Sequence, residues 1–253
     1  MSERTPTELV HLVIDGPIAT ITLDSEHNRN ALSKQLVTEL FGHLRSAEAD
    51  DAVRVVLVRS AGRVFCSGAD LSEATEGGME EGARAIVDLQ RLIVSMSKPV
   101  VTELAGPVRA GGIGIVAASD IAIASEDATF ALTEVKLGLA AAIISLTVHH
   151  RMNPRAASLT TLGGAVFSGA GAAAYGLVTE AVAPDALDER VAAVCAELAT
   201  GAPQGLRESK RILTRDLVTR IDAAGEEMAA LSARLFASDE AREAMMAFLS
   251  RKK

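Results

Sequence analysis

The amino-acid sequence predicts an α/β fold that ends in a purely helical region. Strand patterns and helical patterns alternate as far as residue 182, and after Pro184 only amphipathic helical spacing recurs. Hydrophobic residues make up 49% of the 253-residue chain, which is enough for the core of one large domain. Aromatic residues make up only 3%, so we expect a core of Ala, Val, Leu and Ile.

The first elements expected along the chain are a hairpin, a helix and a buried strand. Residues 10–24 contain two β-branched runs on either side of a Gly-Pro pair, which predicts the hairpin. Residues 33–50 have leucines at helical spacing after Ser33, a suitable N-cap. The continuous apolar run at 53–60 indicates a strand that is buried on both faces.

The middle of the chain predicts short helices and strands joined by glycine-rich turns. A polar, acidic loop is expected at 72–82, and a helix at 83–97 that ends before Pro99. The remaining predictions are a buried strand at 99–106, a short helix at 111–119, short strands at 120–125, 128–132 and 177–182, and helices between 140 and 176.

The region after Pro184 carries three helical faces. Their apolar residues are Leu206, Leu213, Leu217 and Ile221, then Met228, Leu231 and Leu235, then Ala241, Met245 and Phe248. Such faces need an apolar partner, which is either the chain's own core or another subunit, and we expect another subunit. The chain thus divides into a core domain over 1–195 and a helical region over 196–253.

Composition and net charge limit the classes of function that the chain can have. A formal net charge of −8 argues against nucleic acid as a partner, because phosphates require a basic surface. No apolar run is long enough to span a membrane, and the polar N-terminus does not resemble a signal peptide. Cys66 and Cys195 are expected to be reduced, so we predict a cytoplasmic protein. The histidines lack metal-ligand spacing, and no metal site is expected.

Two turns of small residues, at 65–70 and 106–114, follow predicted strands. In each turn, backbone N–H groups that few side chains cover are expected near the start of a helix. If the two turns face each other, two amides can point at one oxygen, which is the geometry of an oxyanion hole. The alternative is that the small residues only let strand and helix pack closely.

Four sequence segments, two of which contain these turns, follow one another in the same order as the sequence motifs of a known protein family. They are NRNALS (28–33), RVFCSGADL (63–71), AGPVRAGGIGIVAASDIAIAS (105–125) and ATFALTEVKLGL (128–139). In sequence and spacing they resemble the crotonase (enoyl-CoA hydratase/isomerase) superfamily. The resemblance implies a crotonase-like spiral of ββα units with a C-terminal helical region. It also implies an acyl-CoA thioester as substrate, no further cofactor, and a homotrimer or dimer of trimers in which the region 196–253 mediates trimerisation.

The resemblance also assigns roles to individual residues. The backbone N–H groups of Ala69 and Gly111 would hold the thioester oxygen, and Glu134 matches a catalytic glutamate of the family. The residues that match the family's CoA-binding path are Arg29, Ala31, Arg63, Ser67, Asp70 and Leu71.

The chain departs from the family pattern at Gly114, where typical hydratases have a second catalytic glutamate. Hydration needs a base that activates water and an acid that protonates Cα, and glycine provides neither. Three alternatives follow: hydration of a 2-enoyl-CoA with Glu134 as the single acid/base, Δ3,Δ2-isomerisation with Glu134 as a proton shuttle, or acyl-CoA binding without turnover. We expect hydration.

Overall fold

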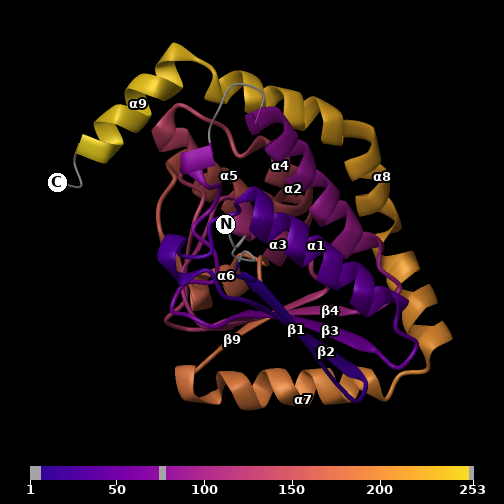
Figure 1. Cartoon of the computed structure of the whole chain (residues 1–253). Helices are drawn as coiled ribbons and strands as arrows, with labels where there is room; N and C mark the ends of the chain where they lie inside the picture. The colour runs from indigo at the N-terminus through magenta and orange to yellow at the C-terminus, as the bar shows by residue number, and fades with distance from the viewer. Residues whose placement is uncertain (1–6, 74–77, 251–253) are drawn as a thin grey trace, which may run out of the picture.

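The structure, a computed structural model, describes residues 7–73 and 78–250 (Figure 1). Its strands are β1 (Val10–Asp15), β2 (Ile18–Leu23), β3 (Val55–Ser60), β4 (Val100–Leu104), β5 (Val108–Arg109), β6 (Ile121–Ser125), β7 (Thr129–Ala131), β8 (Phe167–Ser168) and β9 (Glu180–Val182). Its α-helices are α1 (Lys34–Ala49), α2 (Gly78–Ser95), α3 (Gly111–Ala118), α4 (Ala142–Arg151), α5 (Pro154–Gly163), α6 (Gly169–Ala174), α7 (Leu187–Ala199), α8 (Pro203–Phe236) and α9 (Asp239–Ser250). Its 3₁₀ segments are η1 (Glu26–Asn28), η2 (Leu71–Glu73), η3 (Glu134–Leu137) and η4 (Pro184–Ala186).

The strands form two sheets, as the α/β prediction requires. The larger sheet has the order β1-β2-β3-β4-β6-β9, in which only the β1–β2 hairpin is antiparallel. The smaller sheet has the order β5-β7-β8, and β5 is parallel to β7. Helix α7 crosses one face of the larger sheet, and α1 to α4 lie on its other side (Figure 1). The α/β fold with a helical C-terminal region is therefore confirmed.

Strand β3 shows why the amino-acid sequences of the central strands are continuous apolar runs. Val56 and Val58 face the main core, whereas Val55 and Leu57 face a second cluster that includes Leu187 of α7. Successive side chains point to opposite faces, so a strand with a layer of protein on both sides is apolar throughout. The predicted hairpin and the helix at 33–50 are also confirmed, and Ser33 accepts a hydrogen bond from the Leu36 N–H.

The loop predicted at 72–82 is wrong from residue 78 onward, where α2 begins. Glu80 and Glu81 stand in the first helical turn, where negative charge interacts favourably with the helix dipole. Glu80 also pairs with Arg84 one turn later, at 2.7 Å. Acidic residues that looked like a loop are thus the start of a helix. The part of that loop at 74–77 lies outside the described residues.

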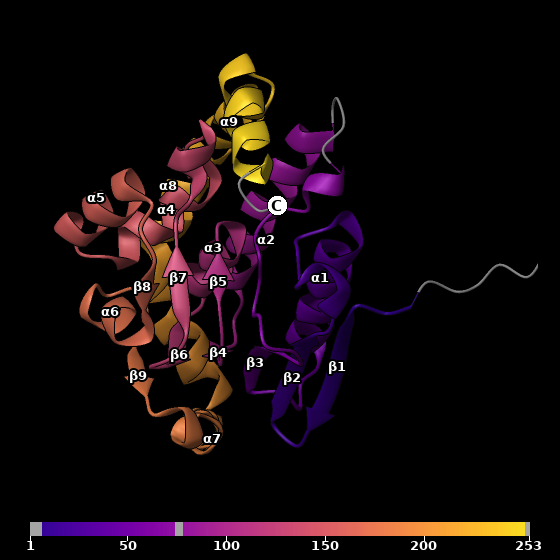
Figure 2. The ribbon, with the colours of Figure 1, turned by 90° about the vertical axis from the view of Figure 1, so that its left-hand side faces the viewer.

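The C-terminal helices bury one side against their own chain. Helix α7 contacts β3, β4 and β6 and lies at the opposite end of the molecule from α9 (Figure 2). Helix α8 packs along α2 and α4, and α9 contacts η3. The predicted face on α8 is wrong at Leu213, which is 78% exposed, although Leu217 and Ile221 are buried. Leu217 and Ile221 are thus covered by the chain itself, whereas the expectation that another subunit covers the C-terminal helices stays a prediction. No helix in the described ranges is long and apolar enough to cross a membrane.

Candidate active site

The register of the strands brings the two small-residue turns together. Cys66 forms an isolated bridge with Val108, and the Arg109 N–H donates to the Cys66 carbonyl at 2.9 Å. A Cβ on Gly68 would lie 3.0 Å from the Ala110 Cβ, so the two backbones are in contact. Gly68 also has φ +99°, a backbone conformation that residues with a side chain rarely adopt. Glycine is therefore required both by the close contact and by the backbone conformation.

The Ala69 amide in the first turn and the Gly111 amide in the second are unpaired. From residue 65 to 68 the N–H groups donate to Pro107, Arg29 and Cys66, and those of Ala110 and Ile113 donate to carbonyls of the chain. Among the residues that the structure describes, the N–H groups of Ala69 and Gly111 have no such acceptor. Gly111 is the first residue of α3, where N–H groups lack helical partners and the helix dipole favours negative charge.

Glu134 approaches the same region from the neighbouring strand. Arg109 of β5 is in register with Ala131 of β7, and the Ala110 N–H donates to the Ala131 carbonyl. Parallel strands end at the same edge, so η3 with Glu134 begins beside the turn that carries Gly111. Glu134 Oε2 is buried without a hydrogen-bond partner in the described structure. Burial raises the pKa of the Glu134 carboxyl to about 7.

The position of the missing glutamate is filled by protein. A Cβ on Gly114 would lie 2.6 Å from Ile144 Cγ2 and 3.1 Å from Gln90 Oε1. Gln90 is 1% exposed, and its amide is fully used: Nε2 donates to the Ile86 and Ile143 carbonyls, and Oε1 accepts from the Thr147 hydroxyl. Gln90 therefore has no free group with which to replace a second catalytic carboxylate.

Sequence reasoning missed Gln90, although a signal was present. Gln90 is a polar residue on the apolar stripe of α2, between Ile86, Val87, Ile93 and Val94. A polar side chain at such a position needs buried partners. Those partners, in α4, lie more than 50 residues away and could not be identified from local spacing.

The predicted CoA-binding residues of the loop after β2 lie next to the first turn. Arg29 is exposed and adopts φ 59°, and its carbonyl accepts from the Ser67 N–H at 3.1 Å. Ala31 is buried, and the Ser67 hydroxyl donates to the Asn28 carbonyl. A left-handed conformation at a non-glycine residue is costly, so this loop is held by its neighbours.

The other predicted CoA-binding residues follow β3. Arg63 is exposed, and Leu71 begins η2. Asp70 is engaged by its own chain: Oδ2 accepts from Asn28, and Oδ1 accepts from the Ser72 N–H and hydroxyl. The hydrogen bond from the Ser72 hydroxyl is the main cause that holds the pKa of Asp70 below its usual value. The Asp70 carboxylate therefore stabilises the turn through hydrogen bonds to its own chain.

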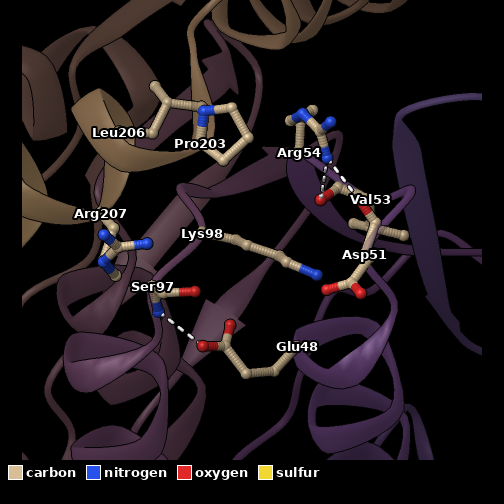
Figure 3. Close-up of a pocket in the computed structure, with 9 residues that line it drawn as sticks. All are labelled: Glu48, Asp51, Val53, Arg54, Ser97, Lys98, Pro203, Leu206 and Arg207. Atoms are coloured by element: carbon tan, nitrogen blue, oxygen red, sulfur yellow. Dashed lines mark hydrogen bonds between the residues drawn. The ribbon is translucent and has the colours of Figure 1, made fainter.

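A separate pocket of about 350 Å³ lies at the other end of the sheet, before β3 and β4 (Figure 3). Lys98 extends into it, and its Nζ donates to the carbonyls of Ala47 and Asp50. Glu48 Oε1 accepts from the Ser97 N–H at 2.8 Å. These groups connect the end of α1 to the start of β4. They precede the strands whose far ends lead to Ala69 and Gly111, so this pocket does not belong to the candidate active site.

Comparison with known proteins decides the family. The model of the family Enoyl-CoA hydratase/isomerase matches residues 14–253. The chain belongs to the enoyl-CoA hydratase/isomerase family. A solved enoyl-CoA hydratase from Mycobacterium avium is 44% identical, with a TM-score of 0.91 and 96% of each chain covered. The crotonase-type fold is thereby confirmed.

Named relatives in this family catalyse different reactions. An (E)-benzylidenesuccinyl-CoA hydratase from Thauera aromatica is 28% identical, over 82% of this chain and 84% of the relative. A peroxisomal Delta(3,5)-Delta(2,4)-dienoyl-CoA isomerase from Arabidopsis thaliana is 27% identical, over 99% of this chain and 93% of the relative. The family is thus shown, and its members include both hydratases and isomerases.

Proposed function

We propose that this protein adds water to a 2-enoyl-CoA thioester with Glu134 as its single acid/base. The observation that carries the proposal is the combination of unpaired Ala69 and Gly111 amides with the buried, unpaired Oε2 atom of Glu134. A pKa near 7 lets one carboxyl both accept and donate a proton at neutral pH. The filled space at Gly114 supports a reaction that uses one carboxyl rather than two.

The proposed reaction has two steps. The Glu134 carboxylate takes a proton from water, and the water oxygen bonds to Cβ. The electrons of the double bond move to the thioester oxygen, where the N–H groups of Ala69 and Gly111 stabilise the enolate. The protonated Glu134 then donates its proton to Cα, the carbonyl re-forms, and the carboxylate is regenerated.

A second candidate is Δ3,Δ2-isomerisation, which also needs only one base. Glu134 would take a proton from Cα of a 3-enoyl-CoA and return it to Cγ, through the same enolate. The lack of a second carboxyl at Gly114 is compatible with this reaction. The third candidate is a protein that binds acyl-CoA without turnover, and the unpaired Oε2 atom of Glu134 weighs against it.

One pair of assays separates these functions. Crotonyl-CoA and a 3-enoyl-CoA are offered separately, and the absorbance of the conjugated thioester is followed. Hydration consumes the conjugated form of crotonyl-CoA, whereas isomerisation produces it from the 3-enoyl-CoA. In the proposed reaction Glu134→Gln lowers kcat by about a thousandfold and still binds CoA esters, because only the proton transfer is removed. Binding by both proteins with turnover by neither would support the non-catalytic alternative.

We propose in addition that the exposed arginines bind the CoA phosphates. Arg29 and Arg63 flank the turn that holds Ala69, and no side-chain partner neutralises either one within the described ranges. A guanidinium is well suited to phosphate because it donates two hydrogen bonds in a fixed fork. Ala31, Ser67, Asp70 and Leu71 would shape the path between them.

We also propose that the protein is a homo-oligomer, in agreement with the predicted trimer or dimer of trimers. Apolar side chains of α5, η3 and the segment after α5 are exposed near one another: Val135, Leu159, Leu162 and Val166. Their exposed fractions range from 42% to 75%. A group of large apolar side chains at one place on a surface is typical of a protein–protein contact, and a second copy is the partner we assign.

A further inference from the structure

Cys66 lies between the two turns of the candidate active site. Its side chain is fully buried, and its Sγ accepts a hydrogen bond from the Gly68 N–H at 3.5 Å. Gly112, at the start of α3, packs against the same sulfur, because a Cβ on Gly112 would lie 2.9 Å from the Cys66 Sγ. A Cβ on Gly112 would lie 2.6 Å from the Cys66 Cβ, so the cysteine side chain is in direct contact with that turn. One thiol therefore contacts both turns.

The two glycines that contact the sulfur are the sequence neighbours of Ala69 and Gly111. Gly68 precedes Ala69, and Gly112 follows Gly111. Adjacent peptide planes are rigid and share one Cα, so fixing one N–H direction leaves only two dihedral angles to orient the next. The sulfur thus restricts the directions in which the N–H groups of Ala69 and Gly111 can point.

The second turn needs such support because Ala110 has φ +45°, which is unfavourable for a residue with a side chain. Gly68, at φ +99°, has the freedom of a glycine, so its N–H direction is fixed by its contacts. A side chain that accepts from the N–H two residues later stabilises a tight turn, as Asx and ST turns do. Cys66 makes this contact within its own turn and adds a second contact to the start of α3.

A nucleophilic role for Cys66 does not fit its surroundings. Burial raises the pKa of the Cys66 thiol to about 12, so the thiol is neutral at pH 7. In the part of the chain that the structure describes, the sulfur is hydrogen-bonded to the Gly68 amide and to no histidine. The neutral sulfur is instead a weak acceptor that can hold N–H groups.

We propose that Cys66 is a positioning residue that aligns the Ala69 and Gly111 amides of the oxyanion hole through its contacts with Gly68 and Gly112. This inference rests on the proposed function. Because the amides stabilise charge that develops only during the reaction, misalignment should lower kcat more than it weakens substrate binding.

The first test compares Cys66→Ala with Cys195→Ala. Cys195 is also a free, buried cysteine, but it lies in α7 on the other side of the sheet. We expect Cys66→Ala to lower kcat for the enoyl-CoA substrate by about tenfold with KM changed less than about twofold. Cys195→Ala should leave kcat unchanged, although both variants lower the urea midpoint. An equal kcat in the two variants would overturn the inference.

Cys66→Ser is expected to restore part of the kcat that Cys66→Ala loses. The hydroxyl keeps an acceptor on a shorter bond, so its kcat should fall between those of the wild type and Cys66→Ala. If Cys66→Ala does not fold, the comparison of Cys66→Ser with Cys195→Ser replaces it, with a loss of several-fold expected in the first variant only. A Cys66→Ser protein less active than a folded Cys66→Ala would contradict the acceptor role.

The second test does not depend on turnover. Acetoacetyl-CoA can bind as an enolate, whose absorbance reports the charge on its oxygens, whereas butyryl-CoA cannot. We expect Cys66→Ala to weaken acetoacetyl-CoA binding and its enolate absorbance about tenfold more than it weakens butyryl-CoA binding. Equal weakening would show that Cys66 only packs. If wild-type protein converts neither enoyl-CoA, the proposed function fails, while this comparison still decides whether Cys66 aligns the two amides.

Discussion

At the residue scale, the carboxyl of Glu134 determines what chemistry the site can perform. Its Oε2 atom is buried without a partner, and burial raises the pKa of the carboxyl to about 7. A carboxyl with the usual pKa would be a poor acid at neutral pH, and one with a much higher pKa would be a poor base. The environment of Glu134 therefore allows one residue to perform both proton transfers.

A pH profile tests this assignment. The free enzyme must hold Glu134 ionised both to accept a proton from water in hydration and to accept the Cα proton in dehydration. Protonation below the pKa removes the base, so kcat/KM should rise with pH and level off above about 7 in both directions. The measurement is kcat/KM between pH 5 and pH 9, with crotonyl-CoA and with 3-hydroxybutyryl-CoA. A bell-shaped profile in either direction would indicate a second acid and contradict the single-carboxyl reaction.

Much of the candidate site could be predicted at this scale, and the reasons for the limits are physical. Ala69, Gly111 and Glu134 stand in local motifs, so one sequence was enough to select them. Whether an amide is free depends on every acceptor around it, and those acceptors come from distant segments. The contact of Cys66 with Gly112 joins residues of two separate turns, and no local pattern shows it.

At the element scale, three helices fill the space that a second glutamate would occupy. Gly114 of α3 faces Gln90 of α2 and Ile144 of α4, and the hydrogen bonds of Gln90 to Ile143 and Thr147 connect α2 with α4. These helices therefore pack closely around the glycine and leave no room for a glutamate side chain.

Restoring the glutamate should consequently fail. Gly114→Glu places a carboxylate against Ile144 and the saturated Gln90 amide, so we expect a loss of about 2 kcal/mol or more in the free energy of unfolding. We also expect no gain in kcat. Gly42→Glu is a suitable control, because Gly42 also lies in a helix and has open space around its Cα. Urea unfolding and the crotonyl-CoA assay measure both effects, and a stable, faster Gly114→Glu enzyme would contradict this account.

Helix α8 shows why an apolar pattern misidentified a helix face. Its buried stripe includes Lys210, Thr214 and Gly225, whereas Leu213 is exposed. Gly225 lets α8 approach Val87 of α2 closely. Lys210 is 4% exposed because its Nζ pairs with Asp120 at 2.7 Å and donates to two carbonyls. Small residues and a buried ion pair thus share the buried face with Leu217 and Ile221, and the predicted Leu213 is not part of it.

At the scale of the whole molecule, the exposed apolar group on α5 and η3 bears on assembly. Leu162 is 75% exposed, and its group lies next to the segment that carries Glu134. A second copy that covers this group would also restrict the movement of η3. Assembly and catalysis would then depend on the same element.

Light scattering coupled to size exclusion tests the proposed assembly. We expect the wild type to be a trimer or hexamer and Leu162→Glu to be smaller, because a charge in an apolar contact is costly. Leu213→Glu on α8 is the matched control, with a 78% exposed leucine, and should keep the wild-type mass. If Leu213→Glu lowered the oligomer mass and Leu162→Glu did not, the contact would instead lie in the predicted trimerisation region at 196–253.

In the proposed reaction two main-chain amides and one carboxyl act on a single thioester. The decisive measurement is a crystal structure of Glu134→Gln with bound crotonyl-CoA. We expect a thioester oxygen about 3 Å from both the Ala69 and the Gly111 nitrogen, with residue 134 beside Cα and Cβ. A thioester oxygen held by other groups, or an acyl chain remote from residue 134, would contradict it.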